Sequence, residues 1–411
     1  MHLFISSVSD DPIVVLKTIS TIRPDKAILL VTEKAREKRW NTALGSIRKI
    51  TGIDINPLNI PEHDAELESV ARRIENKLNE NAPSKITADC TTGRGLFRIG
   101  IVDVCRNYAQ TKNIEFSVCY NDGDKKSVRI INDFGKNYTE DKPVPIEVKF
   151  NSISDRLSLY GANIIEEYVC FIKNGTVLQN NPSLITHLFS SLDVRMYFGN
   201  FLSMCQEWAK RKKIEIPKDN KGKPDIGALE FKFREEYFAN YSDRAIFDFL
   251  GKKSFTTIFE NIISNMCVDI ISKDKKLTEI VSGVFGGIKV ADVKESRKAK
   301  FEIDTLILLK TGDIVALETK TAFGLANISS QKDLESRIKN IRDFTGAYTK
   351  WALIFPFTRE DLHKPTDKYL QGFAYKTRDS WHSKDKRILM IDELESYLKE
   401  TILGRVDRGK Q

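Results

Sequence analysis

Residues 86–98, ITADCTTGRGLFR, run from an apolar strand pattern through a polar, glycine-rich loop into the start of a helix. The same order of strand and helix repeats through the N-terminal part of the chain. The strand patterns cover 2–6, 27–31, 53–58, 86–89 and 115–120, and the helical patterns lie near 12–20, 34–50, 62–80 and 96–110. This alternation predicts an α/β fold with a parallel sheet and helices on both of its faces.

The rest of the chain departs from this alternation and indicates further units. A hairpin turn at 121–124 and two strand patterns lead up to residue 150, and a helical pattern follows. Beyond residue 250 the order is helix, strands, helix, strand, and then a last strand and helix. We therefore expect an N-terminal parallel-sheet domain (1–150), a helical linking domain (151–250) and a C-terminal α/β domain (251–411).

The composition is that of a folded protein with more than one domain. The chain has 411 residues, of which 41% are hydrophobic and 30% are charged, and its formal net charge is +8. This modest positive excess permits a polyanionic partner. The six cysteines lack metal-site spacing, and no apolar run approaches the roughly 18 residues that cross a bilayer. We expect a cytoplasmic protein with reduced thiols and no membrane contact.

The strongest chemical pattern is a pair of strand segments within residues 301–320, joined by a Thr-Gly turn. Side chains alternate faces along a strand, so Glu318 and Lys320 share one face. An odd loop centred on Thr311 places Asp304 directly opposite Glu318, whereas an even loop shifts the pairing by one residue. Opposed carboxylates repel each other unless a cation lies between them. Oxygen ligands of this kind favour Mg²⁺ or Mn²⁺, and the matching chemistry is phosphodiester hydrolysis.

Two simpler interpretations stay open for these residues. An exposed, salt-bridged face of an antiparallel hairpin would show the same Glu-x-Lys pattern. The helix that precedes the hairpin carries Glu260 at the edge of its apolar face, where the carboxylate could reach the same metal. A core helix with an incidental glutamate is an equal alternative.

Asp304, then Glu318-Thr319-Lys320, with Glu260 on the preceding helix, resembles the D…(D/E)xK core of restriction-endonuclease-like, or PD-(D/E)xK, nucleases. The resemblance implies that Asp304, Glu318 and Glu260 bind the metal and that Thr319 contributes its carbonyl oxygen. It also implies that Lys320 assists the attacking water. Asp304, Glu318, Lys320 and Glu260 are then the catalytic residues of a metal-dependent endonuclease.

Three loops of the first domain follow strands at one edge of the predicted sheet. Ligands of parallel α/β sheets bind at the carboxyl ends of strands, near helix N-termini with free N–H groups. Hydroxyls and glycines there make a phosphate or nucleotide cradle. The dinucleotide fingerprint and the P-loop are both incomplete. The candidate ligand-binding residues are Ser7, Ser9, Asp11, Thr32, Thr91, Thr92, Gly93, Arg94, Gly95 and Arg98.

These loops resemble those of the CRISPR-associated Rossmann-fold (CARF) sensor domains. With the C-terminal pattern, the whole chain resembles the CRISPR ancillary nucleases activated by cyclic tetra-adenylate. The resemblance implies a homodimer that binds one cyclic oligoadenylate across its two-fold axis, with Arg94 and Arg98 on phosphates and Thr91 and Thr92 on ribose or adenine. It also implies that the ligand aligns two nuclease sites in type III CRISPR antiviral defence. Their substrate would be single-stranded DNA or RNA, or duplex DNA that is nicked.

A second function class also stays open. The chain could be a nucleotide-responsive transcriptional regulator, with a helix-turn-helix in its helical middle region and a C-terminal hairpin that is only structural. The basic stretch at 210–213 favours this reading. The regulator predicts salt-dependent, sequence-specific binding to duplex DNA without metal-dependent cleavage.

Overall fold

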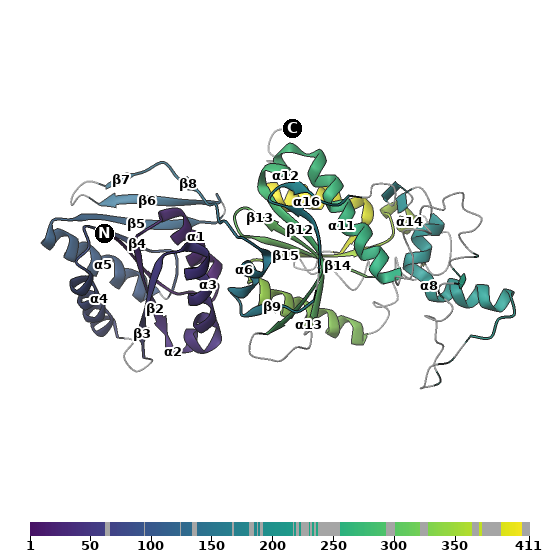
Figure 1. Ribbon diagram of the computed structural model, residues 1–411, viewed down its shortest axis with the longest axis horizontal. Coiled ribbons are helices and arrows are strands. Elements are labelled where there is room, and N and C mark those ends of the chain that lie inside the picture. The colour runs from purple at the N-terminus through teal and green to yellow at the C-terminus, as the bar shows by residue number, and fades with distance from the viewer. Residues whose placement is uncertain are drawn as a thin grey trace.

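The computed structural model has two β-sheets with both parallel and antiparallel pairings, each packed with helices, in separate halves of the molecule (Figure 1). It describes residues 1–61, 66–93, 95–123, 125–133, 138–166, 168–180, 192–216, 255–292, 301–320, 328–363 and 388–404, with a few shorter pieces between 185 and 236 and at 370–371.

The first sheet has the strand order β3-β2-β1-β4-β5-β6-β7, with β8 paired to β6. The pairings among β1 to β5 are parallel, and β6 to β8 add an antiparallel edge. The strands are β1 (His2–Ser7), β2 (Lys26–Thr32), β3 (Asp54–Ile60), β4 (Lys85–Asp89), β5 (Glu115–Asp122), β6 (Ser127–Asp133), β7 (Tyr138–Glu140) and β8 (Val144–Pro145). The predicted Rossmann-like parallel sheet is therefore confirmed.

Helices cover both faces of this sheet because successive side chains of each strand point to opposite faces. Phe4 of β1 packs with α1 and α3 on one face, whereas Leu3 and Ile5 of the same strand pack with α4 and α5 on the other face. The carboxylate of Asp11 caps α1 by accepting a hydrogen bond from the backbone N–H of Ile13. The helices are α1 (Pro12–Ile22), α2 (Glu33–Ala35), the π-helical turn η1 (Arg36–Trp40), α3 (Asn41–Thr51), α4 (Leu67–Asn81) and α5 (Gly95–Lys112).

The second sheet has the order β11-β10-β12-β13-β14-β15-β16, with β9 paired to β12. Its pairings are antiparallel as far as β14 and parallel from β14 to β16. The strands are β9 (Ala162–Ile164), β10 (Val169–Lys173), β11 (Thr176–Val177), β12 (Val281–Asp292), β13 (Phe301–Leu309), β14 (Ile314–Thr319), β15 (Lys350–Phe355) and β16 (Ile388–Met390). The predicted C-terminal α/β fold is present.

The long helices of the second half lie on opposite faces of this sheet. The face of Ile307 and Leu317 packs against α11 and α16, and the face of Leu306 and Ala316 packs against α13. The helices are α6 (Ile153–Ser158), α8 (Leu192–Arg211), α11 (Phe255–Lys273), α12 (Lys275–Ile280), α13 (Ile328–Thr345), α14 (Arg359–His363), the 3₁₀ turn η4 (Ile391–Glu393) and α16 (Leu394–Leu403). Among the described helices, none is both long enough and apolar enough to cross a membrane.

The region 151–250 differs from the all-helical prediction. It holds α6 and α8, but it also supplies β9, β10 and β11 to the second sheet. These strands are only three, five and two residues long. Strands so short carry no local periodicity, and β9 and β10 are held by pairing with β12, more than a hundred residues away in the chain.

Candidate functional site

The β13–β14 hairpin has the register that opposes the two predicted carboxylates. Its backbone pairs run from Leu308 with Ile314 to Thr305 with Leu317. This pairing has an odd loop centred on Thr311, and the same register continued by one residue sets Asp304 opposite Glu318. The even-loop alternative does not occur.

Asp304 lies where the regular pairing of β13 with β14 ends. Its Oδ2 accepts hydrogen bonds from the backbone N–H of Thr319 at 2.7 Å and from the Thr319 hydroxyl at 2.8 Å. The residue is only 5% exposed. A buried carboxylate with two donors on one oxygen is fixed in orientation, so Asp304 has a set direction at the end of the sheet.

Glu318 and Lys320 form the second part of the site. Glu318 is 1% exposed, and the ammonium of Lys320 lies 3.8 Å from its Oε2. The backbone N–H of Lys320 bonds the carbonyl of Ile354 on β15, which anchors the end of β14. The lysine places a positive charge beside the buried carboxylate of Glu318. Burial of both carboxylates does not fit the alternative of an exposed salt-bridged hairpin face.

Glu260 lies on α11, and the predicted three-carboxylate metal group with Asp304 and Glu318 is not found among the described residues. Helix α11, which carries Glu260, covers the face of the sheet to which Thr305 points, since the hydroxyls of Ser264 and Thr305 lie 2.7 Å apart. Asp304 follows the opposite alternation. Within the part of the chain that the structure describes, no group of three or more His, Cys, Asp or Glu side chains could hold a metal ion.

The donor set of Asp304 and Glu318 nevertheless fits Mg²⁺ or Mn²⁺. Mg²⁺ is commonly bound through one or two carboxylates, with waters and phosphate oxygens as its other ligands. Asp304 keeps its Oδ1 outside the two hydrogen bonds from Thr319. The N–H and hydroxyl of Thr319 are both engaged with Asp304, so the carbonyl is the group that Thr319 could offer.

The first domain has a cavity of about 400 Å³ where the loops after β1, β2 and β4 meet. Small-molecule sites usually have volumes of about 300–1,000 Å³. The lining includes four of the predicted ligand-binding residues, Ser7, Ser9, Thr32 and Gly93. The other lining residues are Val8, Asp10, Leu30, Lys34, Ala35 and Phe97.

A hydrogen-bond network beneath the cavity holds the loops after β1 and β4 together. The buried carboxylate of Asp89 accepts from the hydroxyls of Ser6 at 2.7 Å and Thr92 at 2.9 Å, and from the backbone N–H of Thr91 at 2.8 Å. The hydroxyl of Ser7 donates to the carbonyl of Thr92 at 2.7 Å. The two loops are therefore preorganised by the protein itself.

The other predicted residues that the structure describes are not among the residues lining this cavity. Thr92 is buried in the Asp89 network, and the Thr91 hydroxyl accepts from the backbone N–H of Asn121. The guanidinium of Arg98 donates to the carbonyl of Cys90 at 3.4 Å. Gly95 begins α5, and Arg94 lies outside the described residues.

Asp11 also stands away from the cavity lining. Besides capping α1, its carboxylate accepts from the backbone N–H of Ala347 at 3.1 Å and from the hydroxyl of Tyr160. Asp11 thus joins the two halves of the molecule instead of facing the cavity.

The prediction missed Lys34, a positively charged residue that lines the cavity. It lies two residues after Thr32, at the carboxyl end of β2. A lysine directly beyond a parallel strand was the available signal, because that edge of the sheet is where ligands bind.

Burial disfavours the thiolate form of the cysteines. All six are free, and burial raises the pKa of each thiol, that of Cys205 to about 11. A raised pKa keeps a thiol protonated and unreactive at neutral pH.

Comparison with solved structures finds this fold in other proteins. Can2 from Sulfobacillus thermosulfidooxidans, in complex with cyclic tetra-adenylate, matches with a TM-score of 0.58 at 13% identity, over 98% of this chain and 99% of that chain. Protein VC1899 from Vibrio cholerae matches with a TM-score of 0.56 at 12% identity, over 98% of each chain. No family model and no curated protein matches the sequence. The chain therefore shares the two-domain α/β fold of these two proteins.

Proposed function

We propose that this protein is a metal-dependent nuclease activated by a cyclic oligoadenylate that binds the cavity of its first domain. The observation that carries the proposal is the buried opposition of Asp304 and Glu318 beside Lys320 at the end of β13 and β14. The cavity and the fold shared with a protein whose structure holds cyclic tetra-adenylate support the sensor half.

In the nuclease half, Asp304 and Glu318 would hold Mg²⁺ or Mn²⁺, with the carbonyl of Thr319 as a further ligand. When bound, such an ion activates water and polarises a phosphodiester. The bonds from Thr319 keep Asp304 in one orientation, so its position need not be established during each reaction. The ammonium of Lys320 can orient the attacking water or offset the negative charge that develops on the phosphate.

In the sensor half, the cavity offers the chemistry that a cyclic nucleotide needs. Lys34 can pair with a phosphate, and the hydroxyls of Ser7, Ser9 and Thr32 can bond phosphate or ribose. A two-fold symmetric ring would contact the same loops of two copies, which makes the active form a homodimer. Arg94 and Arg98 stay in the proposal as phosphate partners.

The test combines binding and cleavage with matched isosteric variants. Purified protein is incubated with Mn²⁺ and either plasmid or single-stranded DNA or RNA, with and without cyclic tetra-adenylate. We expect cleavage to need both additions and to fall by about 100-fold or more in Asp304→Asn and Glu318→Gln. Glu260→Gln is assayed beside them, because Glu260 is the further carboxylate predicted to bind the metal, and a comparable loss of cleavage would support that role.

The outcomes separate the two function classes. Equal cutting in every sample would refute the nuclease. Sequence-specific binding to duplex DNA with no metal-dependent cleavage would favour the transcriptional regulator instead.

A further inference from the structure

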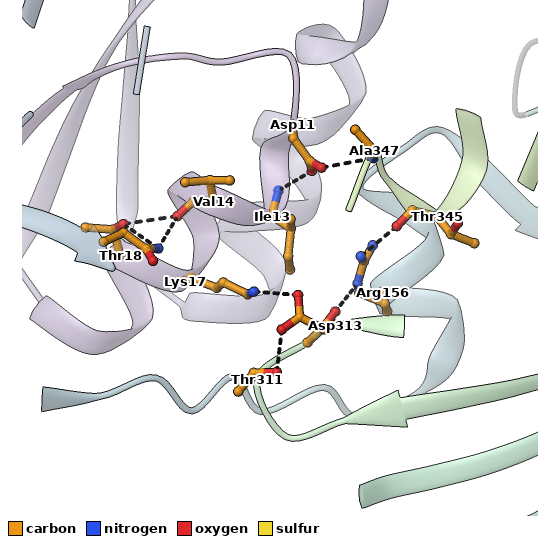
Figure 2. A network of polar contacts seen from close by, with 12 residues as sticks. Asp11, Ile13, Val14, Lys17, Thr18, Arg156, Thr311, Asp313, Thr345 and Ala347 are labelled. Atoms are coloured by element: carbon orange, nitrogen blue, oxygen red, sulfur yellow. Dashed lines mark hydrogen bonds and ion pairs between the residues drawn. The ribbon is translucent and has the colours of Figure 1, made fainter. Parts of the chain in front are cut away.

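The loop that lines the cavity is joined directly to the second half of the molecule. Ser9 and Asp10 line the cavity, and Asp11 follows them and begins the cap of α1. Figure 2 shows the carboxylate of Asp11 between the start of α1 and Ala347, which follows α13. One side chain therefore contacts both halves one residue away from the cavity.

The fit at this junction is close. Gly346 has a φ of +105°, and a Cβ there would lie 2.4 Å from the Tyr160 hydroxyl oxygen and 3.1 Å from Asp11 Oδ2. Only glycine lets the backbone approach so closely. A small movement of Asp11 must therefore move the segment at 345–349 or break its bonds, because packed groups do not deform continuously.

From Tyr160 the contacts continue to the hairpin that carries the proposed nuclease residues. The guanidinium of Arg156 lies over the Tyr160 ring, 4.9 Å from its centroid. Its Nε donates to the carbonyl of Gly312 at 2.7 Å, and one Nη donates to the carbonyl of Thr345 at 2.8 Å. Gly312 belongs to the turn between β13 and β14.

Arg156 is not fully satisfied in this arrangement. The residue is 2% exposed, and its Nη1 has no hydrogen-bond partner among the described residues. A buried donor without an acceptor is unfavourable, so an arrangement that offers it one can compete with the observed arrangement.

A second tie reaches the same turn from α1. The ammonium of Lys17 lies 2.6 Å from the carboxylate of Asp313 (Figure 2). Helix α1, capped by Asp11 at its start and bonded to the turn through Lys17, thus spans the distance between the cavity and the hairpin.

We propose that Asp11 is a positioning residue that couples occupancy of the cavity to the nuclease hairpin, through its bonds to Tyr160 and Ala347. This inference rests on the proposed function and adds the route of its regulation. A ligand that contacts Ser9 and Asp10 changes the position or freedom of Asp11, which changes its bonds to the second domain. Coupling of this kind requires that the ligand binds more tightly to one of two arrangements of the junction, so that binding shifts the equilibrium between them.

The experiment measures ligand binding, amide exchange and cleavage on the full chain. Tyr160→Phe removes one hydroxyl and keeps the ring under Arg156. Asp11→Asn keeps an oxygen that can cap α1 but loses the charge. Ser158→Ala is the matched control, because its hydroxyl also bridges the two halves, to Ser46 at 2.9 Å, without contacting the cavity loop.

We expect cyclic tetra-adenylate to change hydrogen exchange of the amides at 345–349 in the wild type and in Ser158→Ala. In Tyr160→Phe and Asp11→Asn this change should be lost, and stimulation of cleavage should fall by at least about fivefold. Cleavage by Tyr160→Phe with Mn²⁺ but no activator should match that of the wild type.

The failures of the two proposals can be told apart. Binding of the ligand to the wild type without any exchange change at 345–349 would overturn the coupling and leave the proposed function standing. Stimulation of Tyr160→Phe equal to that of Ser158→Ala would do the same. Absence of measurable binding to the wild type by calorimetry would overturn both.

Discussion

Substitution of Gly93 by alanine gives the sharpest test of how the cavity is built. Gly93 has a φ of +88°, and a Cβ at this position would lie 1.8 Å from Ser7 Oγ and 2.6 Å from Ser7 Cβ. Ser7 cannot simply turn away, because its hydroxyl is bonded to the carbonyl of Thr92. The substitution therefore strains the backbone and forces apart the two loops that line the cavity.

The expected loss of stability has two separable parts. The left-handed conformation costs an L-residue about 1–2 kcal/mol. Relief of the overlap with Ser7 costs about 1–3 kcal/mol more, as in other overpacked sites. We expect Gly93→Ala to destabilise the first domain by about 2–5 kcal/mol and to weaken binding of cyclic tetra-adenylate.

Two further variants isolate these parts in urea denaturation of the first domain. Gly52 has a φ of +71° with nothing within 4 Å of the added Cβ, so Gly52→Ala should lose only the conformational part. Ser7→Gly in the Gly93→Ala background removes both overlapping atoms and should recover the steric part. Equal losses in Gly93→Ala and Gly52→Ala would refute the steric reasoning.

Three other predictions concern stability. Arg195 forms a buried ion pair with Asp361 at 2.7 Å. Arg195→Met should therefore lower the free energy of unfolding in urea by about 3–5 kcal/mol, because it leaves the buried carboxylate without its partner. A loss below about 1 kcal/mol would contradict this. The ammonium of Lys17 holds the pKa of Asp313 below its ordinary 3.8 although burial opposes the shift, so the stability from this pair is complete above that pH. It should be lost as the pH falls through the lowered value, and Asp313→Asn should flatten the pH profile of thermal unfolding there. Gly45 lies in α3 with open space around it, so Gly45→Ala should stabilise the protein by about 0.5–1 kcal/mol in the same urea assay, and destabilisation would count against it.

The β13–β14 hairpin shows which structural features can be predicted from a short stretch of sequence and which cannot. The two strands and the turn around Thr311 were readable from alternation and the Thr-Gly pair. The choice between the odd and even loops was not, because it depends on backbone geometry. The N–H of Gly312 bonds the carbonyl of Leu309, Gly312 takes a φ of +80°, and the N–H of Leu309 bonds the carbonyl of Asp313.

The cavity shows the same division. The sequence pointed to the edge of the sheet at which the cavity lies, because parallel strands bring their carboxyl ends together. It did not separate Asp11, Thr91 and Thr92 from the residues that line the cavity, because hydroxyls and carboxylates in a loop look alike whether they face a cavity or the protein. Their partners include Tyr160 for Asp11, Asn121 for Thr91 and Ser7 for Thr92, which come from distant segments.

The sequence by itself determined the α/β class, the parallel first sheet and the strand pair that carries Asp304 and Glu318. Each of these depends on periodicity or spacing within a short stretch of chain. Only the tertiary structure decided that β9 to β11 join the second sheet, that α11 covers the sheet face of Ile307 and Leu317, and that Asp11 links the two halves. These features depend on contacts between residues far apart in the chain, and no local pattern records which distant group a side chain will meet.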